Sequence, residues 1–261
     1  MISSTANAKI KNIMNLKKSA RARRKNDCYL VEGPRMFFEI PKDRLMEVYL
    51  TADFEDKYRE KLQGYHYELI SDGVLKHISD TKTPQGVTAI VERKEPTLEE
   101  LLEREEHPLL FVLENLQDPG NLGTIIRTSE GAGVTGIIMN RGTVDPYNNK
   151  VIRATMGAIF RVPIVIVDDL SPVFELFHER GITSYAAHLA GDLFYKSDYR
   201  GGTAFLIGNE GNGLTDQTAE QADVKIRIPM KGQVESLNAA VASTVLMYEA
   251  MRQRDYADIN K

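Results

Sequence analysis

Three short stretches of the sequence combine glycines with polar side chains that could hold a small ligand. They are DPGNLGTIIR (118–127), IGNEGNG (207–213) and PMKGQVESLN (229–238). Each comes after an apolar run that is typical of a buried strand. A strand, a glycine-rich turn and a helix in that order commonly bind a nucleotide phosphate, so a phosphate site is the first hypothesis to test.

The charges in these loops argue against a phosphate. The first loop lacks the G-x-G-x-x-G spacing of dinucleotide sites and the G-K-[S/T] ending of a P-loop, and Arg127 is the only charged residue in the first two turns of its helix. The second loop carries an acid, Glu210, where a phosphate would require a cation. The loops therefore predict a site built mainly from backbone, for a ligand that is not an anion, such as a nucleoside without phosphates.

The loops offer a small set of candidate binding residues. The glycines at 208, 211 and 213 would let the main chain approach a flat ligand closely. The polar candidates are Asn121, Arg127, Asn209, Glu210, Ser236 and Asn238. Two of them have structural alternatives: Arg127 could pair with Glu130, and Ser236 could cap the last helix. An ordinary strand-to-helix turn is the alternative for each loop taken alone, but it explains three such loops less well.

Other chemistry finds little support in the sequence. The five histidines lack metal-ligand spacing, and the single cysteine, Cys28, can complete neither a zinc site nor an intramolecular disulfide. The G-x-S-x-G nucleophile elbow is missing, as are an N-terminal apolar leader and any apolar run approaching 18 residues. We therefore expect a cytoplasmic protein with no metal and no membrane span.

The distribution of charge points to a polyanionic partner although the net charge is −4. Residues 9–25 contain eight basic residues and no acid, a pattern that often contacts nucleic-acid phosphates. A solvated helix face is the alternative. The basic residues are Lys9, Lys11, Lys17, Lys18, Arg21, Arg23, Arg24 and Lys25.

Hydrophobic patterning predicts two α/β domains. We expect a first domain at residues 1–94, a linker at 95–107 and a second domain at 108–261. The linker should be an acidic helix between two prolines. The last domain should hold a parallel sheet covered on both faces, because its strands are nearly continuous apolar runs. These runs are 109–114, 135–139, 162–167, 182–187, 203–208 and 224–228. A final helix should bury one face made of Leu237, Ala240, Val241, Val245, Tyr248 and Met251.

Residues 112–254 resemble the SpoU/TrmH family of RNA methyltransferases, within the SPOUT superfamily. NLQDPGNLGTIIRTSEGAG, LIGNEGNGL and IRIPMKGQVESLNAAVASTVLMYEAMRQR are similar to its three signature motifs, and the order is the same. YLVEGPRMFFE (29–39) resembles, more weakly, the substrate-binding domain that is often fused to this family and has the small α/β fold of RNA-binding ribosomal proteins. The resemblance implies a deep trefoil knot, a homodimer formed through the knot region, S-adenosylmethionine as cofactor, and methylation of a ribose 2′-hydroxyl in RNA.

The resemblance also assigns roles to individual residues. Gly208, Ile228 and Leu237 match the cofactor-contacting positions of the family, and Asn209, Gly211 and Met230 are expected beside them. Arg127 is expected to be central to catalysis; because guanidinium stays protonated, binding the adjacent phosphate and stabilising the developing alkoxide suit it better than acting as a base. The other catalytic candidates are Asn121, Glu210, Ser236 and Asn238, and the RNA-binding candidates are Lys17, Lys18, Arg21, Arg23, Arg24 and Arg35.

Several functions remain open at this point. The fused first domain favours ribosomal RNA over transfer RNA as the substrate. A non-catalytic RNA-binding protein on the same fold is the alternative from another class, and the intact polar residues of the motifs favour the enzyme. A nicotinamide oxidoreductase is disfavoured because the phosphate fingerprint is missing. We also expect the small residues Ala239, Ala242 and Ser243 of the last helix to pack against a second copy.

Overall fold

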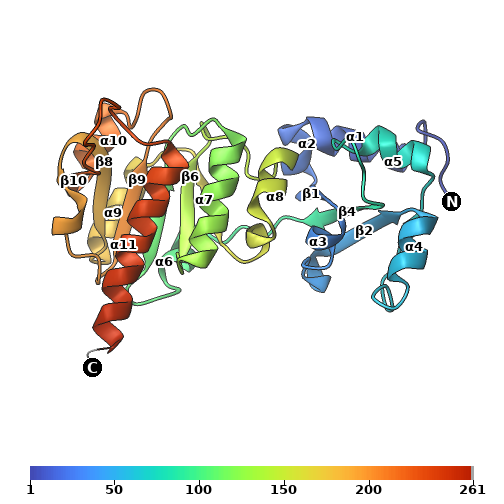
Figure 1. The fold of residues 1–261 in the computed structure, drawn as a ribbon, viewed down its shortest axis with the longest axis horizontal. Helices are drawn as coiled ribbons and strands as arrows, with labels where there is room; N and C mark the ends of the chain where they lie inside the picture. The colour runs from blue at the N-terminus through green and yellow to red at the C-terminus, as the bar shows by residue number, and fades with distance from the viewer. Residues whose placement is uncertain (260–261) are drawn as a thin grey trace. The chain divides into compact units, whose positions relative to one another are not determined.

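The computed structural model describes residues 1–259, which form two compact units (Figure 1). The first unit consists of Met1–Lys94 and Asp145–Phe160, and the second of Glu95–Val144 and Arg161–Lys261. The chain therefore passes from one unit to the other three times. Among the described residues, none of the helices is long and apolar enough to cross a membrane.

The second unit is built on a six-stranded sheet with the order β10-β8-β9-β5-β6-β7, in which every neighbouring pair is parallel. The parallel α/β fold predicted from the apolar runs is thus confirmed, and the strand positions agree with the prediction except that β8 is longer. The strands are β5 (Leu109–Leu113), β6 (Gly136–Asn140), β7 (Ile164–Val167), β8 (Thr183–Leu193), β9 (Thr203–Ile207) and β10 (Val224–Arg227).

Both faces of this sheet are buried, because successive side chains of a strand point to opposite sides. Leu110, Val112 and Leu206 belong to a core with residues of α6, α9 and α10. On the other face, Phe111 and Phe205 have ring centroids 5.3 Å apart. That face is covered by α7 and α11, which lie side by side (Figure 1). The helices are α6 (Leu98–Leu102), α7 (Pro119–Gly131), α9 (Ser171–Glu179), α10 (Asp216–Gln221), α11 (Ala239–Ile259) and the short 3-10 helix η3 (Phe194–Lys196).

The last helix is rotated about its axis relative to the prediction. Its buried residues are Ala240, Ser243, Leu246, Met247 and Ala250, which form one stripe at helical spacing. Val241 and Tyr248, which were expected in the buried face, are 49% and 48% exposed. Ser243 is fully buried, with its hydroxyl bonded to the carbonyl of Ala239 at 2.8 Å, so it is not available to a second copy.

The first unit has a four-stranded mixed sheet with the order β1-β4-β2-β3. Helices α1, α2 and α5 share a core with its strands, in which Ile10, Ile13 and Leu16 are completely buried. The strands are β1 (Cys28–Glu32), β2 (Leu45–Leu50), β3 (Glu68–Leu69) and β4 (Val87–Glu92). The helices are α1 (Ala8–Lys18), α2 (Ala20–Lys25), α3 (Pro34–Phe37), α4 (Ala52–Tyr58), α5 (Asp72–Ile78), α8 (Asn149–Thr155) and the 3-10 helices η1 (Lys42–Arg44) and η2 (Ala158–Phe160).

Two segments fall outside the domains expected from the sequence. Residues 95–107 were assigned to a linker, but Leu101 and Leu102 of α6 are buried in the core of the second unit. Residues 145–160 lie between β6 and β7 in the chain, yet they group with the first unit, where α8 contacts β1. Hydrophobic periodicity marks such segments as helical, but it does not say which core a helix joins.

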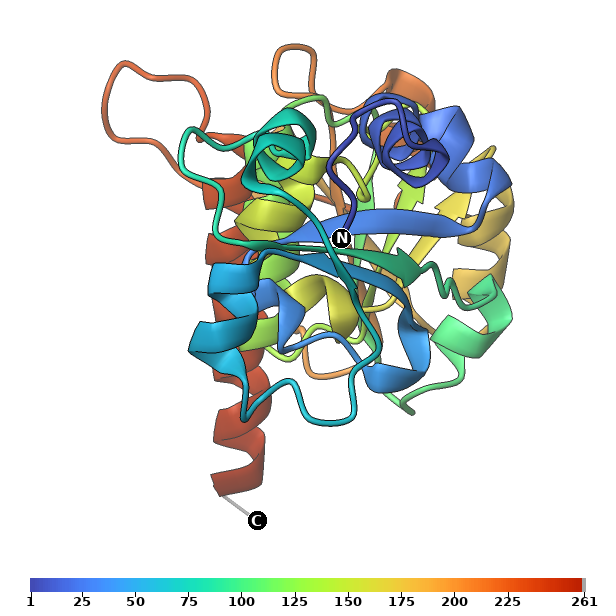
Figure 2. The same cartoon turned by 90° about the vertical axis from the view of Figure 1, so that its right-hand side faces the viewer.

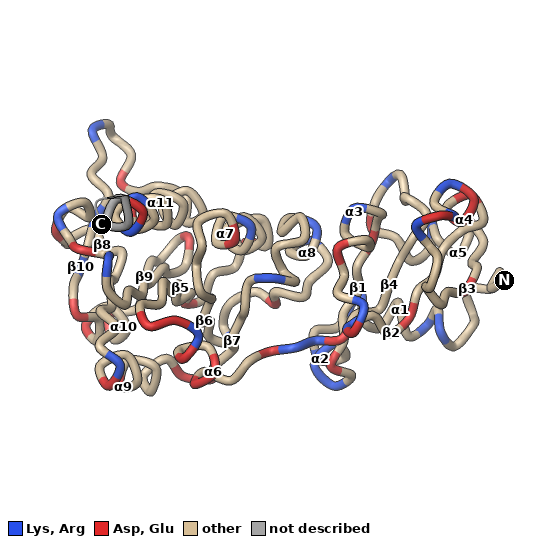
Figure 3. Tube along the Cα trace, turned by 90° about the horizontal axis from the view of Figure 1, so that it is seen from below, with Lys and Arg blue, Asp and Glu red and all other residues tan. Residues whose placement is uncertain are grey.

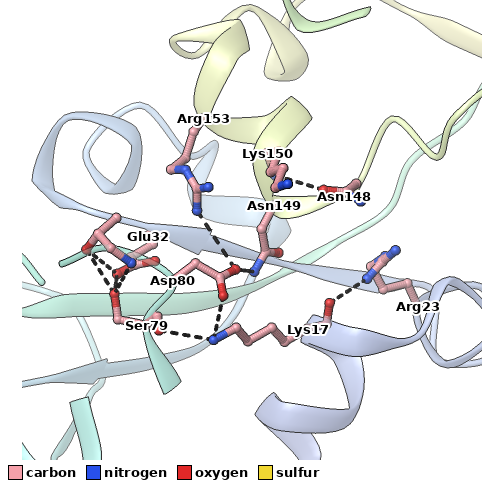
Figure 4. A network of polar contacts seen from close by, with 10 residues as sticks. Lys17, Arg23, Glu32, Ser79, Asp80, Asn148, Asn149, Lys150 and Arg153 are labelled. Carbon is pink, nitrogen blue, oxygen red and sulfur yellow. Dashed lines mark hydrogen bonds and ion pairs between the residues drawn. The ribbon is translucent and has the colours of Figure 1, made fainter. Parts of the chain in front are cut away.

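Polar contacts tie α8 into the first unit (Figure 4). The carboxylate of Asp80 accepts a hydrogen bond from Asn149 Nδ2 at 3.0 Å and pairs with Lys17 Nζ at 2.7 Å and Arg153 Nη1 at 3.9 Å. Burial alone would raise the pKa of Asp80, but the bonds from Lys17 and Asn149 hold it below its usual value. Asp80 therefore connects α1 to α8 as a charged group.

Candidate functional site

The three glycine loops leave strands of the second unit's sheet at its carboxyl edge. The first loop follows β5, the second follows β9 and the third follows β10; β5 and β9 are neighbours, and only β8 separates β9 from β10. The carboxyl edge is where open parallel sheets bind ligands. The predicted convergence of the loops on one region is therefore supported by the topology.

Glu210 of the second loop holds the first loop in place. Its carboxylate accepts hydrogen bonds from the backbone N–H groups of Gln117 (3.0 Å) and Asp118 (2.9 Å), and from Asn121 Nδ2 (3.0 Å). Partial burial would raise the pKa of Glu210, but these bonds hold it below its usual value. Glu210 is thus a charged acceptor for the loop after β5, and it makes no bond to Arg127.

Asn121 and Asn238 extend this connection to the third loop. Asn238 Nδ2 donates to Asn121 Oδ1 at 2.9 Å, while Asn238 Oδ1 accepts from the backbone N–H groups of Ala240 (2.9 Å) and Val241 (3.3 Å). Asn238 therefore caps α11, the role considered for Ser236. Because the amide of Asn121 binds Glu210 at one end and Asn238 at the other, one polar chain joins all three motif loops. We call Glu210, Asn121 and Asn238 the loop bridge.

The second loop is shaped by its own backbone. Asn209 Oδ1 accepts from Gly211 N–H (2.9 Å) and Asn212 N–H (3.1 Å), and Asn209 Nδ2 donates to the carbonyl of Asn115 (2.9 Å). A Cβ on Gly208 would overlap the backbone of Gly213 and Leu214. The glycine at 208 is therefore required by the fold of the loop itself, before any ligand is considered. At Gly211 an added Cβ would meet only Asn209 Oδ1, at an ordinary 3.5 Å.

The third loop suits an uncharged, partly apolar ligand such as S-adenosylmethionine's adenosine. Ile228, Met230 and Leu237 are half-buried, and Ser236 is exposed. Within the part of the chain that the structure describes, no backbone hydrogen bond ties residues 229–237, so their N–H and C=O groups are open to a ligand. Figure 2 shows this loop projecting before α11 begins. Apolar side chains beside open backbone groups fit a nucleoside better than a phosphate.

Arg127 stands apart from the loop bridge. It lies on α7 six residues after Asn121, which places it roughly 9 Å further along the helix and about 120° around its axis. The side chain is exposed and makes no hydrogen bond or ion pair with any residue that the structure describes. Glu130, the alternative partner considered for Arg127, is paired with Arg161 instead. The structure therefore brings Asn121, Glu210 and Asn238 together but leaves Arg127 and Ser236 free.

The sequence did not indicate several residues that build this edge. Glu114 is 6% exposed and accepts hydrogen bonds from Thr215 N (2.8 Å), Thr215 Oγ1 (2.8 Å) and Thr218 Oγ1 (2.6 Å). Gln117 Nε2 donates to the carbonyls of Asn115 and Gly142. An acid that directly ends an apolar strand was the available signal for Glu114, because a charge there needs partners.

A bulge in β8 also adjoins the predicted cofactor loops. Ala186 pairs with Lys225 and Asp192 pairs with Ile226, so residues 187–191 bulge out of the strand. Gly191 lies so close to the backbone of Lys225 and Ile226 that a Cβ would overlap it. Since β8 lies between β9 and β10, the bulge belongs to the strand between those that lead into the second and third loops. The apolar pattern of β8 gave no sign of this irregularity.

The candidate RNA-binding residues of the first unit fall into two groups. Lys18, Arg21, Arg24 and Arg35 are exposed and pair with no acid among the described residues, and Figure 3 marks the run of positive charge along α2. Arg23 is 3% exposed, and its guanidinium bonds to Asp145 Oδ2 at 2.6 and 2.9 Å and to the carbonyl of Leu16 at 2.6 Å. Lys17 is paired with Asp80. Both charges are already paired within the unit, which favours a structural role for Arg23 and Lys17, and contact of these two residues with RNA stays a prediction.

A parallel α/β unit with polar, glycine-rich loops at its carboxyl edge is typical of proteins that bind a small ligand at that edge. Residues 108–248 match the SpoU rRNA Methylase family, and residues 7–89 match the MRM3-like substrate binding domain. The chain therefore belongs to the SpoU rRNA methylase family. Across the residues that the structure describes, no group of three His, Cys, Asp or Glu side chains is placed to hold a metal ion.

Individual relatives resemble the chain over nearly its whole length. It is 30% identical to the 23S rRNA (guanosine(2553)-2′-O)-methyltransferase RlmP of Bacillus subtilis, over 95% of this chain and 97% of that one. It is 31% identical to the 23S rRNA (guanosine-2′-O-)-methyltransferase RlmB of Pectobacterium atrosepticum, over 87% and 97%. The SpoU methyltransferase AviRb of Streptomyces viridochromogenes, crystallised with AdoMet, superposes with a TM-score of 0.86 at 28% identity, covering 95% of this chain and 98% of that one.

Proposed function

We propose that the protein is an S-adenosylmethionine-dependent methyltransferase that modifies a ribose 2′-hydroxyl in ribosomal RNA. The observation that carries this proposal is the loop bridge, because it fixes the three family motifs at one edge of the sheet. The full-length similarity to two 23S rRNA 2′-O-methyltransferases supports the reaction, and the AdoMet-bound relative supports the cofactor. We also propose a cytoplasmic location, which is in keeping with a ribosomal RNA substrate.

The cofactor is expected against the second and third loops and supplies both the methyl group and its leaving group when bound. Gly208, Asn209 and Gly211 would present backbone to it, while Ile228, Met230 and Leu237 would cover its apolar surface. In the family these loops belong to a deep trefoil knot, and we extend that topology to this chain. The protein's own contribution is then to align the ribose oxygen with the methyl group and to exclude water.

Arg127 is the candidate for stabilising charge at the reacting oxygen. Because its guanidinium is exposed and unpaired among the described residues, it is free to bind the phosphate next to the target ribose. The loop bridge occupies Asn121 and Asn238 with each other, so their first role is to position the loops, and Ser236 is the free hydroxyl beside them. The exposed Val241 and Tyr248 lie seven residues apart on α11 and support a homodimer formed through this helix.

The substrate is proposed to be a guanosine of large-subunit ribosomal RNA, because both relatives named above carry that specificity in their names. The test is to map 2′-O-methyl groups in ribosomal RNA from cells that lack the gene and from the same cells supplied with it. One ribose methyl should disappear and return. Unchanged ribosomal RNA with a changed transfer RNA would favour the tRNA alternative, and no change in any RNA would favour a non-catalytic RNA-binding protein.

A further inference from the structure

An open pocket of about 520 Å³ lies on the side of the second loop that faces the start of α10. It is lined by Asn115 and Gln117 from the first loop, by residues 209 and 212–214 from the second, and by Thr215 and Asp216. Of the expected cofactor residues, Asn209 lines it, whereas Ile228, Met230 and Leu237 of the third loop do not. Its size falls within the range of ordinary small-ligand sites.

The hydrogen-bonding groups of this pocket are only partly used by the protein. Asn209 and Thr215 are occupied, because they bond to Asn115, Gly211 and Glu114. The side chains of Asn212 and Asp216 bond to no residue in the described part of the chain, and both are exposed. The pocket therefore offers one free carboxylate, an acceptor with two oxygens, and one free carboxamide, which both donates and accepts.

The lining charge excludes an anion. Lys and Arg are missing from it, and Asp216 would repel a phosphate or a carboxylate. Leu214 and Gly213 also border the pocket. Gly213 is exposed, and a Cβ added to it would meet no atom within 4 Å, so this part of the lining carries no charged side chain and leaves room for a flat ligand. A planar, uncharged ring with hydrogen-bonding edges fits these conditions, and a nucleobase has that chemistry.

From this lining we infer that the pocket receives the guanine base of the nucleotide whose ribose is methylated, with Asp216 as the specificity-determining acceptor. Among the four RNA bases, guanine alone carries two adjacent donors on its pairing edge, N1–H and the N2 amino group. A carboxylate accepts both at once, and the carboxamide of Asn212 can donate to O6. The inference rests on the proposed function and gives that function its base specificity.

The pocket is also joined to the site of methyl transfer. Gln117 lines the pocket, and its backbone N–H donates to Glu210, which begins the loop bridge. A base held against Gln117 and Asp216 thus keeps its own ribose next to the three motif loops. The enzyme would read an unpaired nucleotide, since the pairing edge of the base is turned toward protein.

The experiment compares RNA fragments that carry guanosine or inosine at the mapped methylation position. Inosine lacks only the N2 amino group, so it removes one bond to the carboxylate. Wild-type protein should show about a tenfold higher kcat/KM for guanosine than for inosine. In Asp216→Asn this preference should fall to about one, while S-adenosylmethionine affinity measured by calorimetry stays unchanged. Glu220→Gln is the matched control, because Glu220 is an exposed acid of the same helix outside the pocket, and it should keep the wild-type preference.

The outcomes separate this inference from the proposed function. Wild-type protein that methylates no RNA overturns both. A mapped target that is not guanosine, or an Asp216→Asn variant that still prefers guanosine tenfold, overturns the base pocket and leaves the methyltransferase standing. Loss of S-adenosylmethionine affinity in Asp216→Asn with an intact preference for guanosine would assign the pocket to the cofactor and overturn the inference as well.

Discussion

Arg23 in the first unit and Arg127 in the second both lie on helices, and both were candidate functional residues, but they are used in opposite ways. Arg23 is buried on Asp145 and the carbonyl of Leu16, whereas Arg127 is exposed and bonds to no described residue. The charged residues of the two units also differ in the partners that they bind. The first unit neutralises Lys17 and Arg23 with acids, and the second places Glu210 on amide donors.

This difference separates residues that hold the fold from residues that are free to bind. A cation that is already paired with a partly buried carboxylate cannot take an RNA phosphate without leaving that carboxylate unpaired, which is costly. An exposed cation without a partner can bind a phosphate without breaking an existing ion pair. In the second unit the amides and Glu210 are the fixed groups, so the unpaired Arg127 is the residue that a substrate can engage.

The largest effect is expected at Gly208. Gly208→Ala should abolish S-adenosylmethionine binding, because the added methyl group overlaps the backbone of Gly213 and Leu214 and forces the second loop to move. Gly211→Ala should bind the cofactor with nearly normal affinity, because its Cβ meets only Asn209 Oδ1 at 3.5 Å. Isothermal titration calorimetry on both folded variants makes the comparison. Normal cofactor binding by Gly208→Ala would contradict the described shape of the loop.

Arg127 should affect the reaction and leave cofactor binding intact. Arg127→Ala is expected to lower kcat about 100- to 1,000-fold, the usual loss when a group that stabilises developing charge is removed. Single-turnover methyl transfer measures this loss, and calorimetry checks that cofactor affinity is unchanged. Thr124→Ala, an exposed neighbour on α7, is the control. A near-normal kcat in Arg127→Ala would remove the residue from the mechanism.

Arg23 and Arg24 are neighbours in the chain, so replacing each of them compares a buried, paired cation with an exposed one. Arg23→Met should lower the free energy of unfolding by about 3 kcal/mol, because it leaves Asp145 as an uncompensated charge. Arg24→Ala should leave stability unchanged within about 0.5 kcal/mol. Urea denaturation followed by circular dichroism compares the two variants. Equal stabilities would contradict the burial of the Arg23–Asp145 pair.

RNA binding should depend on the exposed cations of the first unit rather than on the buried Arg23. Joint replacement of Lys18, Arg21 and Arg24 by alanine should flatten the plot of log affinity against log salt, by about 0.7 for each lost phosphate contact. Fluorescence anisotropy at several salt concentrations gives the slope. An unchanged slope in this folded variant would mean that the exposed cations form a solvated surface and that RNA is held elsewhere.

The smallest expected effect concerns Glu210 and depends on pH. The folded protein holds the pKa of Glu210 below its ordinary value of 4.5, so its contribution to stability is fully present above that value and is lost as the pH falls through the lowered pKa. Glu210→Gln should therefore lower the thermal midpoint by about 2–4 °C at pH 7 and by less at pH 4. Differential scanning fluorimetry tests this, and a difference that grows on acidification would contradict it.

The sequence predicted the parts of the second unit that depend on local patterning. Continuous apolar runs located the six strands. The glycine spacing and the charges of the loops argued against a phosphate-binding site. The phase of α11 was wrong at Val241 and Tyr248, because the apolar residues of this alanine-containing helix are spread around its axis and do not mark the buried side. Ser236 was considered as the N-cap of α11, but Asn238 has that role; both side chains carry a suitable acceptor, and the structure distinguishes them.

The features of the first unit that differ from the prediction arise from contacts between distant parts of the chain. The partners of Lys17 and Arg23 are Asp80 and Asp145, which no local pattern brings near a basic helix. The same holds for α8, whose grouping with the first unit depends on contacts with β1 rather than on its position between β6 and β7. Tertiary contacts decide which acid pairs with a cation and which hydrophobic core a helix joins. The local sequence pattern therefore does not predict either one.

The most direct test of the whole account is methyl transfer by the purified protein. Unmethylated ribosomal RNA is incubated with S-adenosylmethionine that carries a labelled methyl group, and the RNA is then digested in alkali, which spares the bond next to a 2′-O-methyl ribose. We expect the labelled methyl group in a single alkali-resistant dinucleotide, and we expect no labelled dinucleotide with Arg127→Ala over the same time. Label on a base, or no transfer by protein that binds the cofactor, would contradict it.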